Sequence, residues 1–120
     1  MAIDFKKTQK EFYQPSFERR TATMSNAVEF ASYTLRKGKS VSDLLLVSDK
    51  FNDKFLSKQK GYISRKLLYD GKKWADYVLW ETVEDAQNAQ QIASGDAIAR
   101  EYISFMIGIS CRNYSIEKEY

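Results

Sequence analysis

The fold is decided by residues 62–80, YISRKLLYDGKKWADYVLW. Both ends of this stretch are rich in β-branched and aromatic residues, which favour strands, and Asp70-Gly71 between them is a turn signal. We therefore expect a β-hairpin with one strand over 62–69 and a second over 74–81.

The sequence on either side supplies helix-start signals and further strands. Ser40 or Ser42 can cap a helix, with Asp43 three residues after Ser40, and Thr82 with Asp85 repeats that spacing. The expected elements are a strand over 28–35, a helix from about 40 to 60, the hairpin, a helix from 82, helical turns over 97–105 and a strand over 107–118. This β-α-β-β-α-β order predicts a ferredoxin-like α+β fold, a four-stranded antiparallel sheet with the helices on one face.

One face of the predicted hairpin joins two charges to several aromatic residues. With a turn of two or four residues, opposed positions have the same parity, so Arg65 and Asp76 lie opposite or diagonal, within reach of an ion pair. The same face carries Ile63, Leu67, Tyr69, Trp74, Val78 and Trp80. A three-residue turn would break this assignment, so the face that lines a cavity depends on the turn.

The opposite face of the hairpin carries Ser64, Lys66, Leu68, Ala75, Tyr77, Leu79 and Glu81. The small Ala75 beside Tyr77 and Leu79 would leave room there for helices. A sheet covered by helices on one side normally has a polar second face, but these strands are apolar on both. We expect an identical sheet from a second copy to cover the remaining face, which gives a homodimer through the sheet face.

Composition excludes several classes of function. The chain has 120 residues, enough for one domain, and no His, which excludes Ser-His-Asp or Cys-His catalysis and imidazole-bound haem or metal. The one cysteine, Cys111, excludes internal disulfides and is expected to be a buried, inert thiol. Carboxylates lack the spacing of a cation site, and no apolar run could cross a membrane. We expect a cytoplasmic protein with no metal, no cofactor and no membrane contact.

Residues 1–24 differ from the rest of the chain. They are polar and charged, with isolated aromatic residues at Phe5, Phe12, Tyr13 and Phe17. They form either a loosely ordered tail or an arm that lays these aromatics on the protein's own core or on a partner subunit. We therefore expect an N-terminal extension over 1–24 and a single domain over 25–120.

Two stretches, FLSKQKGYISR (55–65) and WADYVLWETVEDA (74–86), resemble a known family. The shared pattern is a helix ending in a Gln-x-Gly-aromatic turn, a strand, a hairpin, and a strand that ends Trp-Glu-Thr before an Ala-rich helix. This pattern is similar to the antibiotic-biosynthesis-monooxygenase-like branch of the dimeric α/β-barrel superfamily. The resemblance covers roughly residues 26–120.

The resemblance implies a homodimer whose two sheets close a barrel, with a small cavity in each protomer between sheet and helices. Some members are cofactor-free oxygenases of phenolic polycyclic molecules, and others degrade haem, isomerise lactones or have no known activity. The oxygenases line their pocket with Asn, Trp, Tyr and Arg. By type and strand position the matching residues here are Arg65, Tyr69 and either Trp74 or Trp80, and no Asn matches. The absence of His argues against the haem-degrading and stress-responsive branches.

Three functions follow from these observations. The first is a cofactor-independent monooxygenase or isomerase acting on a small hydrophobic, phenolic molecule. Arg65 and Asp76 would be its catalytic residues, orienting the substrate's oxygens with Asp76 as proton acceptor, and the substrate-binding residues would be Trp74, Tyr69 and Trp80.

The second function is a non-catalytic homodimer that binds a small ligand or serves in assembly. In that case Arg65 and Asp76 are a structural ion pair and the aromatic residues are packing. The third is RNA binding, because RNA-recognition modules share the element order and residues 73–80 partly match their third strand. Asp76 would place a negative charge on the RNA-binding face, and the net charge is only +3, so we expect no nucleic-acid partner.

Overall fold

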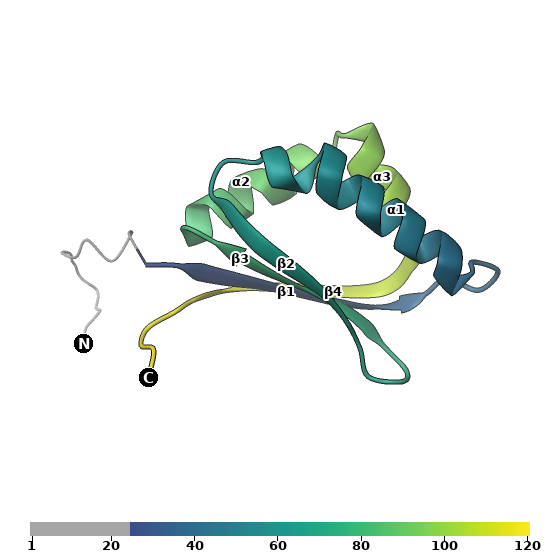
Figure 1. Cartoon of the computed structure of the whole chain (residues 1–120), viewed down its shortest axis with the longest axis horizontal. Helices are drawn as coiled ribbons and strands as arrows, with labels where there is room; N and C mark the ends of the chain where they lie inside the picture. The colour runs from purple at the N-terminus through teal and green to yellow at the C-terminus, as the bar shows by residue number, and fades with distance from the viewer. Residues whose placement is uncertain (1–24) are drawn as a thin grey trace.

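The computed structural model describes residues 25–120 as a sheet covered on one face by helices (Figure 1). Its elements are β1 (Ala27–Leu35), α1 (Val41–Lys54), the 3-10 turn η2 (Leu56–Lys58), β2 (Tyr62–Tyr69), β3 (Trp74–Trp80), α2 (Val83–Ala93), α3 (Ala97–Ile103) and β4 (Met106–Ser115). Over these residues the strands form one antiparallel sheet in the order β2-β3-β1-β4. The predicted ferredoxin-like α+β fold is confirmed. The extension over 1–24 lies outside the described residues.

Each α-helix of residues 25–120 begins at a side chain that caps it. The Ser40 hydroxyl accepts a hydrogen bond from the Asp43 backbone N–H, and the Thr82 hydroxyl accepts one from the Asp85 N–H. Both are predicted start sites, and they satisfy N–H groups that the first turn of a helix leaves free. Asp96 caps α3 in the same way.

The hairpin has a four-residue turn. Tyr69 pairs with Trp74, and the Asp70 carboxylate accepts hydrogen bonds from the backbone N–H groups of Lys72 and Lys73 across the turn. The predicted parity therefore holds over most of the hairpin. At its far end a bulge between Tyr62 and Ser64 shifts the register, so Tyr62 pairs with Trp80. Ile63 therefore has no register partner on β3, and its assignment to that face stays a prediction.

The helices cover the face that carries Arg65 and Asp76, and not the Ala75, Tyr77 and Leu79 face that the sequence suggested for them. The largest apolar residues decide this, because Trp80 and Tyr33 are fully buried beneath the helices. One core cluster lies around Trp80, under η2 and α2, and a second lies around Tyr33, under α1 and α3. Burial of an indole ring contributes more than burial of an alanine, so the Trp side of β3 becomes the inner face.

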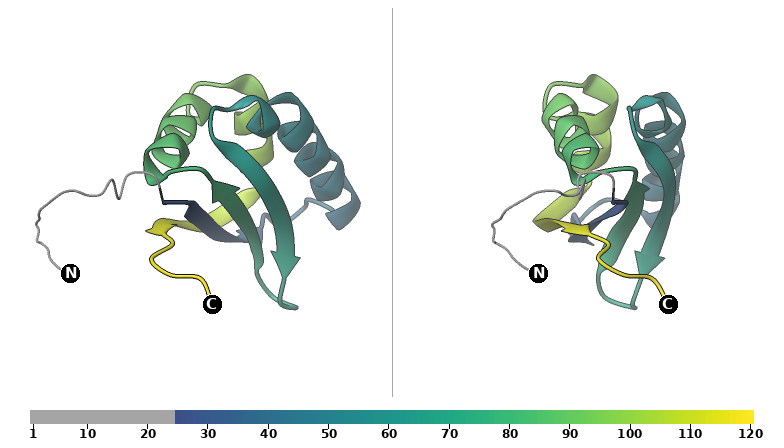
Figure 2. Two further views of the ribbon diagram at one scale, coloured as in Figure 1. Left: turned by 60° about the vertical axis from the view of Figure 1, so that its left-hand side comes forward. Right: turned by 90° about the vertical axis from the view of Figure 1, so that its left-hand side faces the viewer.

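The other side of the sheet is covered by no helix of residues 25–120 (Figure 2). Its central row runs across the four strands from Lys66 through Tyr77 and Phe30 to Arg112. We call this side the open face; it consists of this row and its neighbours Val28, Ser32, Ser64, Leu68, Ala75, Leu79, Ser110 and Tyr114. Phe30, Tyr77, Leu68 and Tyr114 are exposed there. Within residues 25–120 the open face is thus apolar at its centre and basic at both edges.

Gly61, the glycine of the Gln-x-Gly-aromatic turn, should not tolerate a side chain. Its φ is +83°, and a Cβ there would collide with the buried Asp85 side chain. We expect Gly61→Ala to lower the free energy of unfolding by about 2 to 4 kcal/mol, the sum of backbone strain and overpacking. Gly71→Ala is the matched control, because Gly71 also has a positive φ but no atom within 4 Å of a Cβ. Urea unfolding measures both, and equal losses would show that Asp85 moves aside freely.

Candidate functional site

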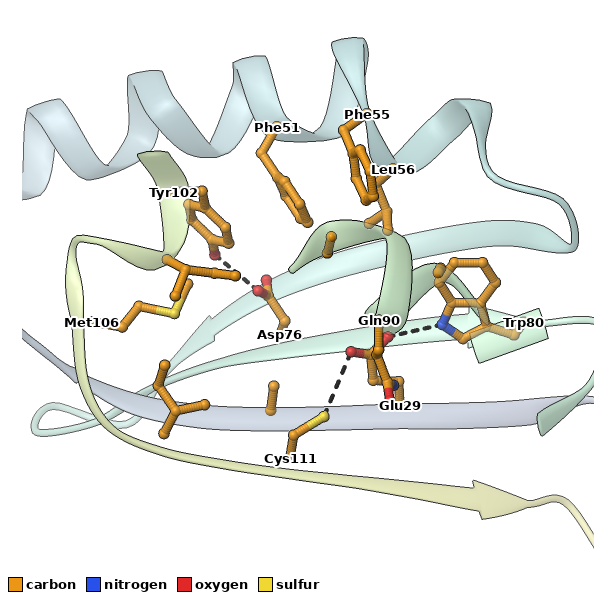
Figure 3. A pocket seen from close by; sticks show the side chains of 15 residues that line it. Glu29, Phe51, Phe55, Leu56, Asp76, Trp80, Gln90, Tyr102, Met106 and Cys111 are labelled. Carbon is orange, nitrogen blue, oxygen red and sulfur yellow. Dashed lines mark hydrogen bonds between the residues drawn. The ribbon is translucent and has the colours of Figure 1, made fainter. Parts of the chain in front are cut away.

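A cavity of about 270 Å³ lies between the helices and the inner face of the sheet (Figure 3). Phe51, Phe55 and Leu56 point into it from the end of α1 and from η2. Ala89 and Ala93 of α2, with Ile103, Met106 and Ile109, complete most of its apolar wall. The polar side chains in the lining are Glu29, Asp76, Gln90, Tyr102 and Cys111. A mostly apolar pocket with a few converging polar groups is typical of a site for a small organic ligand.

Asp76 stands at the centre of a buried hydrogen-bond network. Its Oδ1 accepts from Arg65 Nε at 2.8 Å, and its Oδ2 accepts from the Tyr102 hydroxyl at 2.8 Å. Only 6% of the Arg65 side chain and 9% of the Asp76 side chain are exposed. Because Tyr102 gives its proton to Asp76, the Tyr33 hydroxyl, 3.2 Å away, must donate to Tyr102. The predicted ion pair between Arg65 and Asp76 is confirmed.

Every N–H of the Arg65 guanidinium has a partner in this network. Besides Asp76, it donates to the Ser48 carbonyl and hydroxyl, to Asn52 Oδ1 and to the Tyr102 hydroxyl, at 2.7–3.4 Å. Arg65 therefore ties β2 to β3, α1 and α3. The guanidinium carbon also lies 5.3 Å from the Phe51 ring centroid, in cation–π range.

Burial and the ion pair act in opposite directions on Asp76. Burial raises the pKa of Asp76 above its usual value, and the Arg65 guanidinium and the Tyr102 hydroxyl partly offset that increase. Burial also raises the pKa of Tyr102, and the nearby Asp76 charge raises it further. Tyr102 therefore stays protonated and acts as a hydrogen-bond donor at the edge of the cavity.

Glu29 of β1 is a second carboxylate at the cavity, and no cation of the described residues pairs with it. Its Oε1 accepts a hydrogen bond from Trp80 Nε1 at 3.0 Å, and its Oε2 accepts a weak one from the Cys111 thiol at 3.6 Å (Figure 3). No lysine or arginine of residues 25–120 lies within 4 Å of it. Burial raises the pKa of Glu29, and its hydrogen bonds to Trp80, Cys111 and Gln90 reduce that increase.

Cys111 and Gln90 complete the surroundings of Glu29. Cys111 is exposed on β4, an edge strand of the sheet, so the expectation of a buried thiol is wrong. Partial burial and the adjacent Glu29 raise the pKa of the thiol to about 12, which keeps it protonated and unreactive. The Gln90 and Asn113 amides donate to each other at 2.7 and 3.2 Å, which fixes α2 on β4.

The structure brings two of the five predicted site residues to the cavity. Asp76 and Trp80 line it, and Arg65 lies behind Asp76. Tyr69 and Trp74 do not line it; they stack on each other at the turn end of the hairpin, with ring centroids 4.5 Å apart.

Glu29 and Tyr102 are among the lining residues that the sequence-based candidates do not include, and both form hydrogen bonds at the site. A signal for Glu29 existed: it follows Ala27 and precedes Ala31 and Tyr33 on the inner face of β1, so it is a charged residue in an apolar alternation. Tyr102 had no comparable signal, because its role depends on α3 placing its hydroxyl beside a residue of another element.

Comparison with known proteins supports the fold. No family profile matches the chain, and no curated protein matches its sequence. Among solved structures it is similar to SnoaB, a cofactor-independent oxygenase from Streptomyces nogalater, with a TM-score of 0.64, 10% identity, and coverage of 79% of this chain and 96% of that chain. It is also similar to the ActVA-Orf6 monooxygenase of Streptomyces coelicolor in complex with nanaomycin D. The TM-score is 0.58, the identity is 12%, and the match covers 81% of this chain and 92% of that chain.

A third similar structure is a dimeric ferredoxin-like protein from an uncultured marine organism, with a TM-score of 0.57, 12% identity, and coverage of 82% of this chain and 94% of that chain. At such identities the likeness concerns the fold alone. The chain therefore has the protomer fold of the dimeric α/β-barrel, antibiotic-biosynthesis-monooxygenase-like proteins, as the sequence resemblance implied. No helix of residues 25–120 is long and apolar enough to span a membrane.

Proposed function

We propose that this protein is a homodimeric, cofactor-independent monooxygenase that acts on a small hydrophobic, phenolic molecule. The observation that carries the proposal is the cavity, an apolar space of about 270 Å³ with carboxylates on its wall and a protonated tyrosine beside one of them. Two proteins of similar fold, SnoaB and ActVA-Orf6, are oxygenases.

In this proposal the polar groups orient the substrate and the apolar wall keeps water out. Asp76 uses one acceptor position on each oxygen for Arg65 and Tyr102, so it retains capacity to accept a hydrogen bond from a substrate hydroxyl. Arg65 holds Asp76 in place from behind and is a positioning residue. Phe51, Phe55 and Trp80 offer ring faces and edges to an aromatic substrate.

The chemistry needs no bound redox group, because an electron-rich phenolic substrate can reduce O₂ itself. Oxygenation of a naphthohydroquinone to a hydroxynaphthoquinone shows the balance. One oxygen atom of O₂ becomes the new ring hydroxyl, and the other leaves as water with the two hydrogens that the substrate loses. The protein's part is to bind, orient and deprotonate the substrate.

Oxygen uptake with a panel of hydroquinones tests the proposal. We expect the wild-type protein to raise the uptake rate above background at least tenfold for one or more members, because bound geometry and proton transfer each contribute that much or more. Added catalase should return no oxygen, since a monooxygenase forms water and uncatalysed autoxidation forms hydrogen peroxide.

Two variants of α2 show whether the reaction takes place in the cavity. Ala93 lines the cavity, so Ala93→Phe should abolish the uptake by filling it. Ile92, the neighbouring residue, is exposed and outside the lining, so Ile92→Phe should keep the wild-type rate. Uptake at the background rate with every hydroquinone, or an unchanged rate in Ala93→Phe, contradicts the proposal.

One observation favours a second candidate, a non-catalytic ligand-binding homodimer. All N–H groups of Arg65 and both oxygens of Asp76 are engaged within the protein, as in a structural ion pair. That candidate predicts hydroquinone binding in the cavity with no oxygen uptake.

A further inference from the structure

We infer that Glu29 is the proton acceptor of the cavity, and that the cavity takes a one- or two-ring apolar molecule through a single phenolic hydroxyl that hydrogen-bonds to Glu29. This inference deepens the proposed function and rests on it for the location of the ligand. It assigns the proton-accepting role to β1 and not to the Arg65–Asp76 pair.

The geometry around Glu29 leaves room for one more donor. Trp80 Nε1 occupies one position on Oε1, and the Cys111 thiol occupies one on Oε2 through a long, weak bond. The Gln90 side chain is a third hydrogen-bond partner of Glu29. A carboxylate offers about four acceptor positions, so one remains free on a group that lines the cavity. The rigid indole, itself fully buried, holds Oε1 in place.

Proton transfer costs less at Glu29 than at Asp76. Protonated Asp76 would leave the buried Arg65 charge without its counter-ion, which is a large penalty. Protonated Glu29 leaves no such charge, because no cation of residues 25–120 pairs with it, and its carbonyl oxygen still accepts from Trp80. In the step itself the ligand O–H bond breaks, an O–H bond to Glu29 forms, and the electron pair stays on the ligand oxygen.

The size and lining of the cavity define the ligand class. An apolar cavity of about 150 Å³ holds one benzene ring. The cavity here, at about 270 Å³, therefore suits one or two fused rings. A neutral hydroxyl presents one donor to Glu29, whereas an ammonium group would bring further N–H donors against Ala31 and Ile109, which cannot accept them, and Met106, which is a weak acceptor.

Calorimetric binding without oxygen tests the inference independently of catalysis. The probes are 2-naphthol, 2-methoxynaphthalene, which lacks the donor, and 1-naphthylmethylamine, which is cationic. We expect 2-naphthol to bind most tightly and Glu29→Gln to weaken it about 10- to 100-fold, because a hydrogen bond to a charged group is lost. The variant should leave 2-methoxynaphthalene unchanged. Glu81→Gln, which removes an exposed carboxylate next to Trp80, should have no effect on either.

The pH dependence of 2-naphthol affinity distinguishes a proton-accepting Glu29 from a Glu29 that only supports the structure. Wild-type affinity for 2-naphthol should fall as the pH decreases toward 4.5, the usual value for a glutamic acid, because burial raises the pKa of Glu29 above it. Glu29→Gln should be flat over that range. At neutral pH, Glu29→Gln should also melt at a higher temperature than the wild-type protein, because a raised pKa means that ionised Glu29 destabilises the folded state. This difference in melting temperature should disappear below pH 4.5.

The outcomes separate the two proposals. The inference is overturned, even if oxygen uptake is found, by an unchanged affinity of Glu29→Gln for 2-naphthol. It is also overturned if the wild-type protein binds 2-methoxynaphthalene or 1-naphthylmethylamine more tightly than 2-naphthol. Binding of 2-naphthol that depends on Glu29, without oxygen uptake by any hydroquinone, supports the inference and overturns the monooxygenase proposal.

Discussion

Arg65→Met should lower the free energy of unfolding by about 3 to 5 kcal/mol, the usual result of removing one partner from a buried ion pair. The substitution keeps most of the side-chain volume and removes the charge. It leaves the Asp76 carboxylate in a site that is almost closed to water, with only the Tyr102 hydroxyl to stabilise it. Ser48 and Asn52 on α1 also lose the donor that bridges them to the sheet.

The loss should shrink as the pH decreases. Without the guanidinium, burial raises the pKa of Asp76 further above its ordinary value of 3.8, so the folded variant binds a proton that the unfolded chain releases. The destabilisation by ionised Asp76 in the variant is therefore greatest at a pH above that raised pKa, and it disappears below about pH 3.8. Urea unfolding at neutral pH and at about pH 4 measures both ends of this range.

A double-mutant cycle separates the pair from its surroundings. Arg65→Met/Asp76→Leu removes both charges. Its loss of unfolding free energy should be about 2 to 3 kcal/mol smaller than the sum of the losses in the two single variants. Lys50→Met is the control, since Lys50 pairs with Glu101 at 3.1 Å but about half of each side chain is exposed. Lys50→Met should lower the free energy of unfolding by about 0 to 1 kcal/mol. Equal losses for Arg65→Met and Lys50→Met would show that the buried network contributes no special stability.

The sequence predicts the hairpin and helix starts because both depend on neighbouring residues. The four-residue turn keeps the parity that brings Arg65 to Asp76, and Ser40 and Thr82 cap helices through bonds to residues three positions later. The bulge at Ile63 is harder to predict, because it depends on how the strand enters from the turn at Gly61.

The candidate site could be predicted only in part, because a cavity wall is assembled from distant elements. Asp76 and Trp80 share a strand face with Arg65, and that much follows from alternation. Tyr102 reaches Asp76 from 26 positions away, and Trp80 meets Glu29 from 51 positions away. The spacing of neighbouring residues predicts neither of these two contacts. The choice of inner face also depends on packing volume, which made Trp80 rather than Ala75 the contact for the helices.

The open face bears directly on the homodimer that we propose. Asp76, whose charge argued against RNA binding, lies on the inner face with Glu29, so it gives the open face no negative charge. Aromatic Tyr77 and Phe30 lie at its centre between Lys66 and Arg112. A second copy that packs there would bury the aromatic centre and leave the basic residues at the rim, as expected for a stable interface.

Tyr77→Glu should convert the homodimer to monomers at low micromolar concentration. The two-fold axis brings two copies of the substitution into one interface, so each dimer would move two carboxylates, each opposite Lys66, out of water. The loss of hydration should weaken association by several kcal/mol, because a buried ion pair seldom recovers it in full. That corresponds to a Kd at least about a hundredfold weaker. Light scattering measures the mass, and Leu46→Glu, on the exposed side of α1, should leave it unchanged. A monomeric wild-type protein would contradict the homodimer, and the basic-edged aromatic face would then call for a test with single-stranded RNA.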